Sequence, residues 1–548
     1  MLRKLFKFHG GVHPPEHKLE STATPIRPVP MPEHLVLPLR QHIGKIGKLK
    51  VEVGDHVLKG QLLAEASGTI SAAVHAPSSG TITAIVDQLI PHPSGLPDRC
   101  ITLETDGEDR WIEHHPVDYS NMGRAALFEL LRQSGIVGLG GATFPAHVKL
   151  SPNGKQPITT LIINGAECEP FITCDDMLMR ERADDIVRGA EIARELLGAA
   201  QCIVGIEDNK PQAATAMRQA CARTGSGIEV VVVPTLYPSG DSKRLVTLLT
   251  GKEVPAHRLP TDIGIQCFNA ATVYTLYRFI AYGEPVLSRI ITVTGAVAAP
   301  GNYEVPLGTL MEALLQAAGG VAPEFNDLVM GGPMMGFSLP SHDVPVVKGT
   351  NCIIAATPRM FPPTPAVMPC IRCARCAEAC PVNLQPQELY WFSRAQDFEK
   401  ALDYNLFDCI ECGCCSYVCP SHIPLVQFYR FAKSEIIAQD KALQASSLAR
   451  ERNEFRLQRI EREKRERALK HAQKSAVVGS TETATLDDEK QAAIRTAEER
   501  AKVQREETQP GNVDNLSPAV QKEIAGIDAL REQSSQSDEA RIKEQQEP

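Results

Sequence analysis

The chain has 548 residues, of which 43% are hydrophobic and 22% are charged, and it carries a net charge of −9. This length predicts several domains, and the acidic balance argues against a nucleic-acid-binding protein. The sequence has no uninterrupted apolar run of about 18 residues, which a membrane-spanning helix needs, and its basic start lacks the apolar core of a secretory signal. We therefore expect a multidomain protein that stays in the cytoplasm or on that side of a membrane.

Residues 30–105 contain short apolar stretches, such as LVLPL, GTITAIV and CITLE, separated by turns rich in Gly and Ser. This pattern predicts an all-β unit. The run VEVGDHVLKGQLLAEA, followed by APSSGTITAI, resembles the barrel-sandwich hybrid fold of lipoyl and biotinyl domains. The hairpin between the two halves has no lysine, so the resemblance implies the fold without a prosthetic arm. We expect this domain to cover 1–115.

Residues 120–290 alternate between helical and strand patterns. The stretches RAALFELLRQSGIV, ADDIVRGAEIARELLGA and PQAATAMRQACAR have the apolar spacing of helices, whereas TTLIING, QCIVGIE and IEVVVVP are typical of buried strands. This order predicts an α/β domain with a largely parallel sheet, which we place at 116–288.

Residues 290–345 predict a hairpin with Pro-Gly at its turn, followed by one amphipathic helix that ends at Gly319 and Gly320. This unit, placed at 289–350, resembles the β-grasp ligand-binding module beside the flavin domain of respiratory NADH dehydrogenases. A linker domain without a ligand is the alternative. Five prolines between 352 and 370 then predict an extended connector, with a linker at 351–367.

Nine of the 16 cysteines lie between Cys370 and Cys419. In a long chain without a secretory signal, such a gathering of thiols predicts metal ligands rather than disulfides. The run CIRCARCAEACP has the spacing C-x2-C-x2-C-x3-C-P, and CIECGCCSYVCP repeats it when Cys414 is left out. Two zinc sites are the alternative, but zinc needs neither the duplication nor the C-P ending.

The duplicated spacing is that of bacterial two-cluster ferredoxins, in which the fourth cysteine of each run binds the other cluster. We therefore expect a helical domain at 368–435 with two [4Fe-4S] clusters. Cys414 is predicted to be a free thiol packed beside the second cluster. The predicted ligands are, for the first cluster, Cys370, Cys373, Cys376 and Cys419, and for the second, Cys380, Cys409, Cys412 and Cys415.

Beyond about 435 the composition shifts, and Phe455 is the one aromatic residue. The stretch LARERNEFRLQRIEREKRERALKHAQK is charged all round, which predicts a solvated single helix or disorder, and the last stretch is expected to be disordered. We treat 436–548 as a charged helical or disordered tail.

The α/β region holds GLGGATFPAHVK at 138–149. Backbone amides of a Gly-rich loop can cradle a phosphate, and Lys149 adds a positive charge. A Rossmann fingerprint is not met, because Thr143 replaces the third glycine and a helix, not a strand, precedes the loop. A tight structural turn is the alternative interpretation.

Three further motifs follow in order: NGAECEP at 164–170, TLYPSGDSKRLV from 235 and PTDIGIQCFNAATVYTLY at 260–277. With the Gly-rich loop, they resemble the flavin- and NADH-binding subunit of respiratory complex I. That resemblance implies a non-covalent FMN whose phosphate side is held by Gly138, Gly140, Gly141 and Lys149. It implies that Asn164 and Glu167 border the flavin, that Asn269 and Thr272 lie near its phosphate, that Phe144 and Glu169 flank the nicotinamide, and that the cleft is lined by Tyr237, Gly240 and Asp241.

Three positions depart from that family: Leu139 replaces its arginine, Ala166 its acidic residue and Phe268 the first of its paired asparagines. Solvated loop carboxylates are the alternative for Glu169 and Asp241. FMN suits a chain with two clusters, because it accepts two electrons from NADH and a cluster accepts one at a time. No general acid or base is needed, so we predict no catalytic side chain.

From about 5 to 435 the chain, with KFHGGVHPPEHK at 7–18 and the units above in this order, resembles the C subunit of the Rnf/Rsx ion-translocating electron transport complex. The resemblance implies a peripheral protein on the cytoplasmic side of the bacterial inner membrane. It would oxidise NADH through FMN and pass electrons through both clusters to integral-membrane and peripheral subunits, and indirectly to a ferredoxin-type carrier. The alternative is a non-enzymatic iron–sulfur scaffold with a degenerate flavin site.

Overall fold

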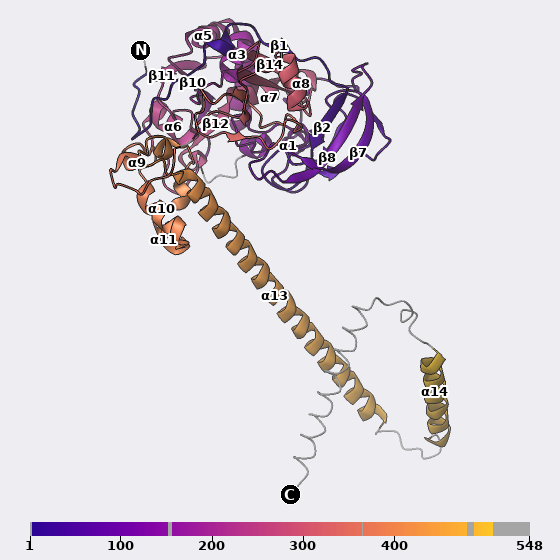
Figure 1. The fold of residues 1–548 in the computed structure, drawn as a ribbon. Coiled ribbons are helices and arrows are strands. Elements are labelled where there is room, and N and C mark those ends of the chain that lie inside the picture. The colour runs from indigo at the N-terminus through magenta and orange to yellow at the C-terminus, as the bar shows by residue number, and fades with distance from the viewer. Residues whose placement is uncertain (1–2, 152–155, 364, 479–486, 508–548) are drawn as a thin grey trace. The chain divides into compact units, whose positions relative to one another are not determined.

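The structure, a computed structural model, describes residues 3–151, 156–363, 365–478 and 487–507 (Figure 1). The chain divides into two compact units, Met1–Lys441 and Ala442–Pro548. None of the helices in the described ranges combines the length and the apolar character that a membrane crossing requires.

The N-terminal domain is built from two antiparallel sheets, as the alternating sequence predicts. Strands β2, β8, β7 and β4 form one sheet, and β3, β5 and β6 form the other (Figure 1). A Cβ on Gly80, whose φ is +156°, would collide with the Glu104 carbonyl, so this close approach of β7 to β8 needs glycine. The strands are β2 (His34–Pro38), β3 (Lys48–Leu49), β4 (His56–Val57), β5 (Leu62–Glu65), β6 (Val74–His75), β7 (Gly80–Leu89) and β8 (Pro97–Thr105).

The α/β domain has the predicted parallel sheet, in the order β11-β10-β9-β12. The loop 134–145 follows a helix, as the sequence indicates, and not a strand. Helices α4 and α7 pack so closely that a Cβ on Gly189 would collide with the Val273 carbonyl. The elements are α1 (Arg124–Gln133), α2 (Ala146–Leu150), β9 (Thr160–Gly165), α3 (Cys174–Glu181), α4 (Ala183–Leu197), β10 (Gln201–Glu207), α5 (Pro211–Thr224), β11 (Glu229–Val233), α6 (Ser242–Thr250), β12 (Ile265–Asn269) and α7 (Ala270–Tyr282).

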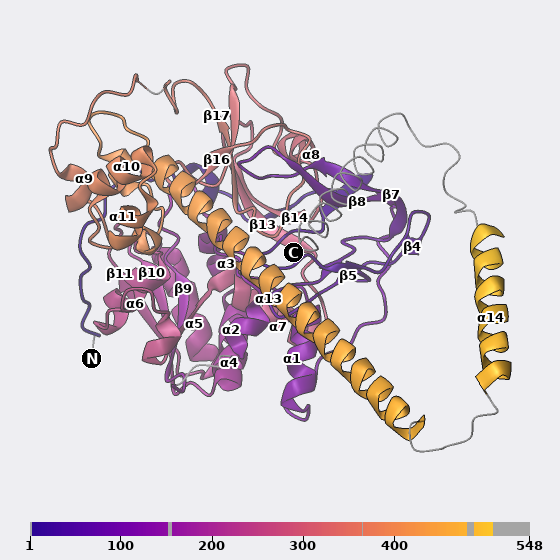
Figure 2. The same ribbon diagram turned by 90° about the horizontal axis from the view of Figure 1, so that it is seen from below.

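The third domain is a six-stranded sheet in the order β1-β14-β13-β17-β15-β16, with α8 beside it (Figure 2). The predicted hairpin and helix are present, and the helix ends just before Gly319. The β-grasp identity of this unit stays a prediction. The elements are β1 (Arg27–Pro28), β13 (Ser288–Gly295), β14 (Gly301–Pro306), α8 (Met311–Ala317), β15 (Asp327–Met330), β16 (Phe337–Ser338) and β17 (Cys352–Ala356).

Strand β17 corrects the extent of the predicted connector. Its five residues are fully buried and pair with β13 on one side and β15 on the other, so they are an inner strand of the sheet. The apolar run CIIAA buries itself as a strand, and the extended segment begins only after it, where the prolines start.

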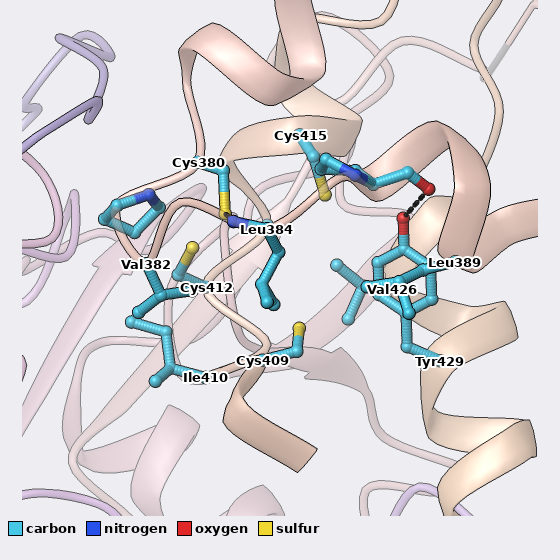
Figure 3. Close-up of a pocket in the computed structure, with 13 residues that line it drawn as sticks. Cys380, Val382, Leu384, Leu389, Cys409, Ile410, Cys412, Cys415, Val426 and Tyr429 are labelled. Atoms are coloured by element: carbon cyan, nitrogen blue, oxygen red, sulfur yellow. Dashed lines mark hydrogen bonds between the residues drawn. The ribbon is translucent and has the colours of Figure 1, made fainter. Parts of the chain in front are cut away.

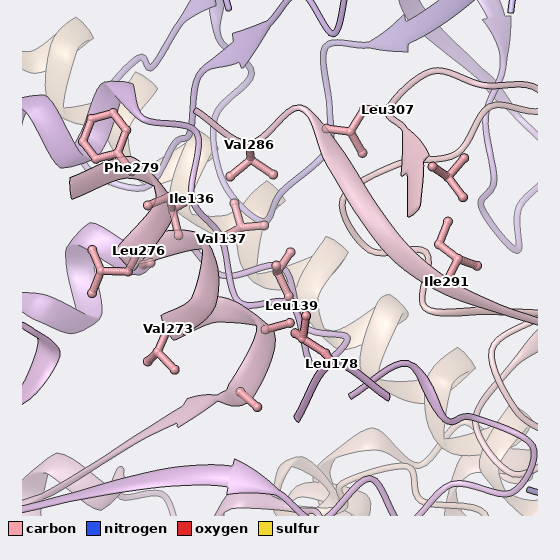
Figure 4. Packing of buried hydrophobic residues seen from close by; sticks show 14 of the residues in the cluster. Ile136, Val137, Leu139, Leu178, Val273, Leu276, Phe279, Val286, Ile291 and Leu307 are labelled. Atoms are coloured by element: carbon pink, nitrogen blue, oxygen red, sulfur yellow. The ribbon is translucent and has the colours of Figure 1, made fainter. Parts of the chain in front are cut away.

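One hydrophobic core runs through these three domains. It includes Val273 and Leu276 of α7, Ile136 from the loop after α1, Val286 from the segment before β13, and Ile291 of the third domain (Figure 4). These three domains therefore share buried surface.

The cysteine domain is helical, as expected. Each cysteine run carries a short helix and is followed by a longer one, and Tyr429 ties the two halves by donating from its hydroxyl to the Pro386 carbonyl at 2.6 Å. The helices are α9 (Arg375–Glu378), α10 (Pro386–Ala395), α11 (Phe398–Asp403), α12 (Cys414–Tyr417) and α13 (Leu425–Val478).

The described part of the tail is helical: α13 continues to Val478, and α14 covers Asp487–Glu507. Exposed pairs one turn apart, such as Arg465 with Glu461 at 3.3 Å, support a solvated helix over disorder for this stretch. The end of the tail, predicted to be disordered, lies outside the described residues.

Candidate electron-transfer sites

The parallel sheet has a switch point between β9 and β12. The chain moves from β9 to β10 and β11 on one side and returns to β12 on the other. Asn164 and Asn269, at the carboxyl ends of β9 and β12, lie directly opposite each other. Open α/β sheets bind their ligands outside the carboxyl ends of the strands at such a point. Both asparagines predicted to adjoin the flavin therefore stand where a ligand is expected.

The Gly-rich loop is held on the first turn of α7. Asn269 caps this helix by accepting from the amides of Ala271 at 2.9 Å and Thr272 at 3.3 Å. The Thr272 hydroxyl in turn accepts from the Leu139 amide at 2.9 Å. These bonds place the bare backbone of the loop beside the positive end of the α7 dipole.

Glycine suits the backbone where this loop meets α7. A Cβ on Gly140 would lie 3.3 Å from the Cβ of Asn269, and Gly141 has a φ of +115°. Gly138 closes the base of the loop by donating to the Phe144 carbonyl at 2.7 Å, which leaves residues 140–142 exposed. An exposed cradle of backbone amides at a helix N-terminus fits the phosphate end of FMN.

Lys149 of α2 is turned toward β12. Its ammonium group donates to the Cys267 carbonyl at 2.7 Å and lies 5.0 Å from the centre of the Phe268 ring. Burial lowers the pKa of this amine. The predicted phosphate-side lysine thus has a structural partner at the end of β12, and the departure at Phe268 supplies its aromatic neighbour.

Glu167 caps helix α3 from a left-handed backbone conformation with a φ of +46°. Its two carboxylate oxygens accept from the amides of Asp175 at 2.7 Å and Asp176 at 3.1 Å. Burial raises the pKa of the Glu167 carboxyl to about 7. Asn164 reaches the other way and donates to the Gly240 carbonyl at 2.8 Å, so the NGAECEP loop is tied to the loop that carries Tyr237.

Glu169 is not a solvated loop carboxylate. It accepts from the amides of Met334 at 2.7 Å and Met335 at 3.0 Å, on a loop of the third domain, and its burial raises the pKa of the carboxyl. Asp241 caps α6 by accepting from Lys243 and Arg244, both at 3.1 Å. Both predicted site carboxylates therefore also position the chain around them.

An N-terminal strap, residues 3–18, holds these loops together. Buried Lys18 donates to the carbonyls of Glu167 at 2.8 Å, Glu169 at 2.9 Å and Ile172 at 2.5 Å. Val12 exchanges backbone hydrogen bonds with Tyr237 at 2.8 and 3.0 Å. Sequence reasoning used this segment as a family signature and missed Lys18 as a residue that shapes the site.

The strap and Tyr237 also touch the cysteine domain. His9 bonds through Nδ1 to the Cys380 carbonyl at 3.1 Å, and the Tyr237 hydroxyl donates to the Cys412 carbonyl at 2.7 Å in a fully buried contact. Tyr237, Cys412 and Cys414 belong to one small hydrophobic cluster. The edge of the candidate flavin site is thus packed against the second cysteine run.

The cysteine domain contains two hollows, each with four thiols on its wall. Three thiols in each hollow come from one run and the fourth from the other run, as Figure 3 shows for the hollow that contains Cys380. The walls are otherwise mainly apolar, as with Leu389 and Val426 in the second hollow. Soft thiolate donors in apolar surroundings suit an iron–sulfur cluster. The two sets are Cys370, Cys373, Cys376 and Cys419, and Cys380, Cys409, Cys412 and Cys415.

Cys414 lines neither hollow. Its side chain is fully buried at the start of α12, where it packs in the cluster with Val12 and Tyr237. The structure therefore separates this thiol from the two sets of four. That Cys414 is a free thiol beside the second cluster stays a prediction.

Four family models match the chain in order. They are the RnfC barrel sandwich hybrid domain at 6–108, the Nuo51 FMN-binding domain at 131–278, the SLBB domain at 290–338 and a 4Fe-4S dicluster domain at 369–423. The fold and these domains define a flavin- and iron–sulfur-containing electron-transport protein.

Curated relatives identify the family. The chain is 46% identical over 486 residues to the C subunit of the ion-translocating oxidoreductase complex of Yersinia pseudotuberculosis serotype O:3, covering 88% of this chain and 69% of that one. It is 47% identical over 523 residues to the same subunit of Erwinia tasmaniensis, covering 94% of this chain and 64% of that one. The chain belongs to the family of C subunits of the ion-translocating oxidoreductase complex, and it spans about two thirds of the length of these two relatives.

A solved structure is also similar. The NAD+-reducing [NiFe]-hydrogenase in its H2-reduced state superposes with a TM-score of 0.42 and 19% sequence identity, over 56% of this chain and 61% of that chain. At this score we draw no functional conclusion from it.

Proposed function

We propose that this chain is the NADH-oxidising peripheral subunit of an ion-translocating complex on the cytoplasmic side of the bacterial inner membrane. Electrons from NADH would pass through FMN and two [4Fe-4S] clusters to the integral-membrane and peripheral partner subunits, and indirectly to a ferredoxin-type carrier. The observation that carries the proposal is the buried Tyr237–Cys412 contact, which joins the loops of an FMN-binding domain to a set of four thiols.

The chain's own residues would hold and orient the cofactor. The amides around Gly140 and Gly141 would bind the FMN phosphate, and Asn164 and Glu167 would border the ring system. Phe144 and Glu169 would flank the nicotinamide. When bound, FMN accepts a pair of electrons and releases them singly, which is the conversion that a one-electron relay needs.

The packing supports an order for the two clusters. The second set of thiols contains Cys412, whose carbonyl Tyr237 holds, so its cluster would take electrons first. The first set contains Cys373, which is exposed, and the neighbouring Ile371 side chain is 67% exposed. That cluster would deliver electrons to a partner protein of the complex.

Anaerobic reconstitution followed by NADH titration tests this function. Two cubane clusters predict about eight irons per chain, one bound FMN, and bleaching of the visible cluster absorbance by NADH with matching EPR signals. A protein that carries the iron but binds no FMN, and whose clusters NADH leaves oxidised, contradicts the NADH role.

A non-enzymatic iron–sulfur scaffold is the second candidate. Two observations favour it: the Leu139 side chain is buried in the core where the family has an arginine, and the Lys149 ammonium is bonded to a backbone carbonyl. The two candidates differ in FMN affinity. Tight FMN binding that is weakened in Lys149→Ala supports the enzyme, whereas absence of FMN binding supports the scaffold.

A further inference from the structure

A cleft lies where the three N-terminal domains of the first unit meet, apart from the Gly-rich cradle and both thiol hollows. It is lined from the barrel-sandwich domain, from one face of α7 and from the chain that enters β13. Its apolar wall includes Leu139, Leu178 and Val286, which Figure 4 labels among the packed core residues. Its polar lining includes Lys59, Arg278 and Arg289.

Two of these three cations are neutralised by carboxylates. Lys59 pairs with Asp109 at 2.6 Å, and Arg278 pairs with Glu284 at 2.5 Å. Arg289 makes no ion pair within the described ranges, although its side chain lies at the meeting point of the domains and the residue is only 4% exposed. A buried cation of this kind calls for an anionic partner.

The hydrogen bonds of Arg289 leave one nitrogen available. Nε donates to the Thr350 carbonyl at 3.0 Å, and Nη2 donates to the Leu139 carbonyl. Nη1 is buried and has no partner among the described residues. Burial raises the pKa of the Asp175 carboxyl, and the positive charge of Arg289 opposes that rise. Asp175 does not line the cleft, however, and forms no hydrogen bond with Arg289 in the described structure. Because Arg289 lines the cleft, a group bound there could supply the partner that Nη1 lacks.

We propose that this cleft binds a small organic monocarboxylate, whose carboxylate accepts from Nη1 of Arg289 and whose apolar part packs on Leu139, Leu178 and Val286. A carboxylate suits the site better than a phosphate. Nε and Nη2 already donate to carbonyls, so Nη1 is the one nitrogen of the guanidinium without a partner among the described residues, and a single carboxylate oxygen can accept from it.

The charges around the cleft also favour a monocarboxylate over a phosphate. The cleft is also lined by the carboxylates of Glu304, Asp109 and Glu284. They would repel a dianion more strongly than a monoanion. The bound carboxylate and the Leu139 carbonyl would both accept from the Arg289 guanidinium, so the ligand would lie beside the Gly-rich loop. Binding in this cleft requires neither FMN nor NADH, so its test is independent of the proposed function.

Ligand-observed NMR titrations on the full chain test the proposal, with benzoate, hexanoate and benzyl alcohol as probes. We expect saturable binding of at least one carboxylate, and binding of benzyl alcohol about tenfold weaker or more, because it lacks the charge-assisted bond. The relative affinity of benzoate and hexanoate distinguishes an aromatic from an aliphatic ligand. No saturable binding of either carboxylate, or equal binding of the neutral alcohol, overturns the proposal.

Three variants locate the binding. Arg289→Met should remove the preference for carboxylate over alcohol. Thr275→Phe, on the α7 wall of the cleft, should displace every probe while leaving Arg289 in place. Thr215→Phe is the matched control: Thr215 is exposed on α5, and its hydroxyl bonds a carbonyl of its own helix at 2.9 Å, as that of Thr275 does at 2.8 Å. Binding that survives in Thr275→Phe overturns the proposal even if Arg289→Met fails to fold.

Discussion

The contact between Tyr237 and Cys412 predicts a measurable coupling between the flavin-site loop and the cysteine domain. Tyr237→Phe keeps the ring and removes the hydroxyl that donates to the Cys412 carbonyl at 2.7 Å. Because the bond is buried, leaving that carbonyl without this donor should cost about 1–3 kcal/mol. That energy corresponds to about 5- to 150-fold in the equilibrium between the docked and undocked states of the loop.

Hydrogen exchange followed by mass spectrometry measures this equilibrium directly. Peptides that contain the amides of Val12 and Tyr237 should exchange faster by that factor in Tyr237→Phe, and peptides from β7 and β8 should be unchanged. Tyr274→Phe is the control, since no hydrogen bond of its hydroxyl occurs among the described residues. Equal exchange of the 236–240 segment in wild type and Tyr237→Phe would refute the reasoning.

Three further predictions concern the same sites. Cys414→Ala should leave the iron content of the reconstituted protein unchanged, whereas Cys415→Ala should lose about four of about eight irons, by colorimetric iron assay. Lys149→Ala should weaken FMN binding about tenfold, measured by quenching of flavin fluorescence, because β12 loses the charge that holds its end. Burial raises the pKa of Glu167 from 4.5 to about 7, so its contribution to stability is full below pH 4.5 and is lost as the pH rises through about 7. Glu167→Gln should flatten that part of the curve of urea midpoint against pH.

Each of these has an outcome that contradicts it. Loss of iron in Cys414→Ala would place that thiol among the ligands. Unchanged FMN affinity in Lys149→Ala would remove the lysine from the flavin site. A stability curve for Glu167→Gln that still falls between pH 4.5 and 7 would assign the titration to another group, such as the neighbouring Asp175, whose pKa burial also raises.

Local spacing predicted most of the cysteine domain. The two runs alone indicated which thiols share a hollow, because three ligands lie within seven residues and the fourth is set by the duplication. Strand and helix patterns likewise predicted the parallel sheet. Strand β17 was missed because its pairing partner β13 lies about 60 residues earlier, and the prolines that follow it favour an extended connector.

The sequence did not predict which residues form hydrogen bonds with each other across the fold. The partner of Tyr237 lies 175 residues away, and Lys18 binds carbonyls 149 to 154 residues away. A single sequence contains no pattern that predicts which carbonyl a side chain will bind, because a backbone carbonyl is available at every position. Glu169 illustrates the same limit, since its burial depends on amides contributed by another domain at Met334 and Met335.

The N-terminal strap has a consequence for how the chain is made. His9, Val12 and Lys18 leave the ribosome before the domains that they bind, and the carbonyl that His9 binds belongs to a residue 371 positions later. Val12 and Lys18 can pair once the α/β domain has been synthesised, but the Cys380 carbonyl that His9 binds emerges only with the cysteine domain. The loop that carries Tyr237 can reach its final arrangement only when the Cys412 carbonyl has emerged, so cofactor loading is expected to follow the synthesis of the cysteine domain.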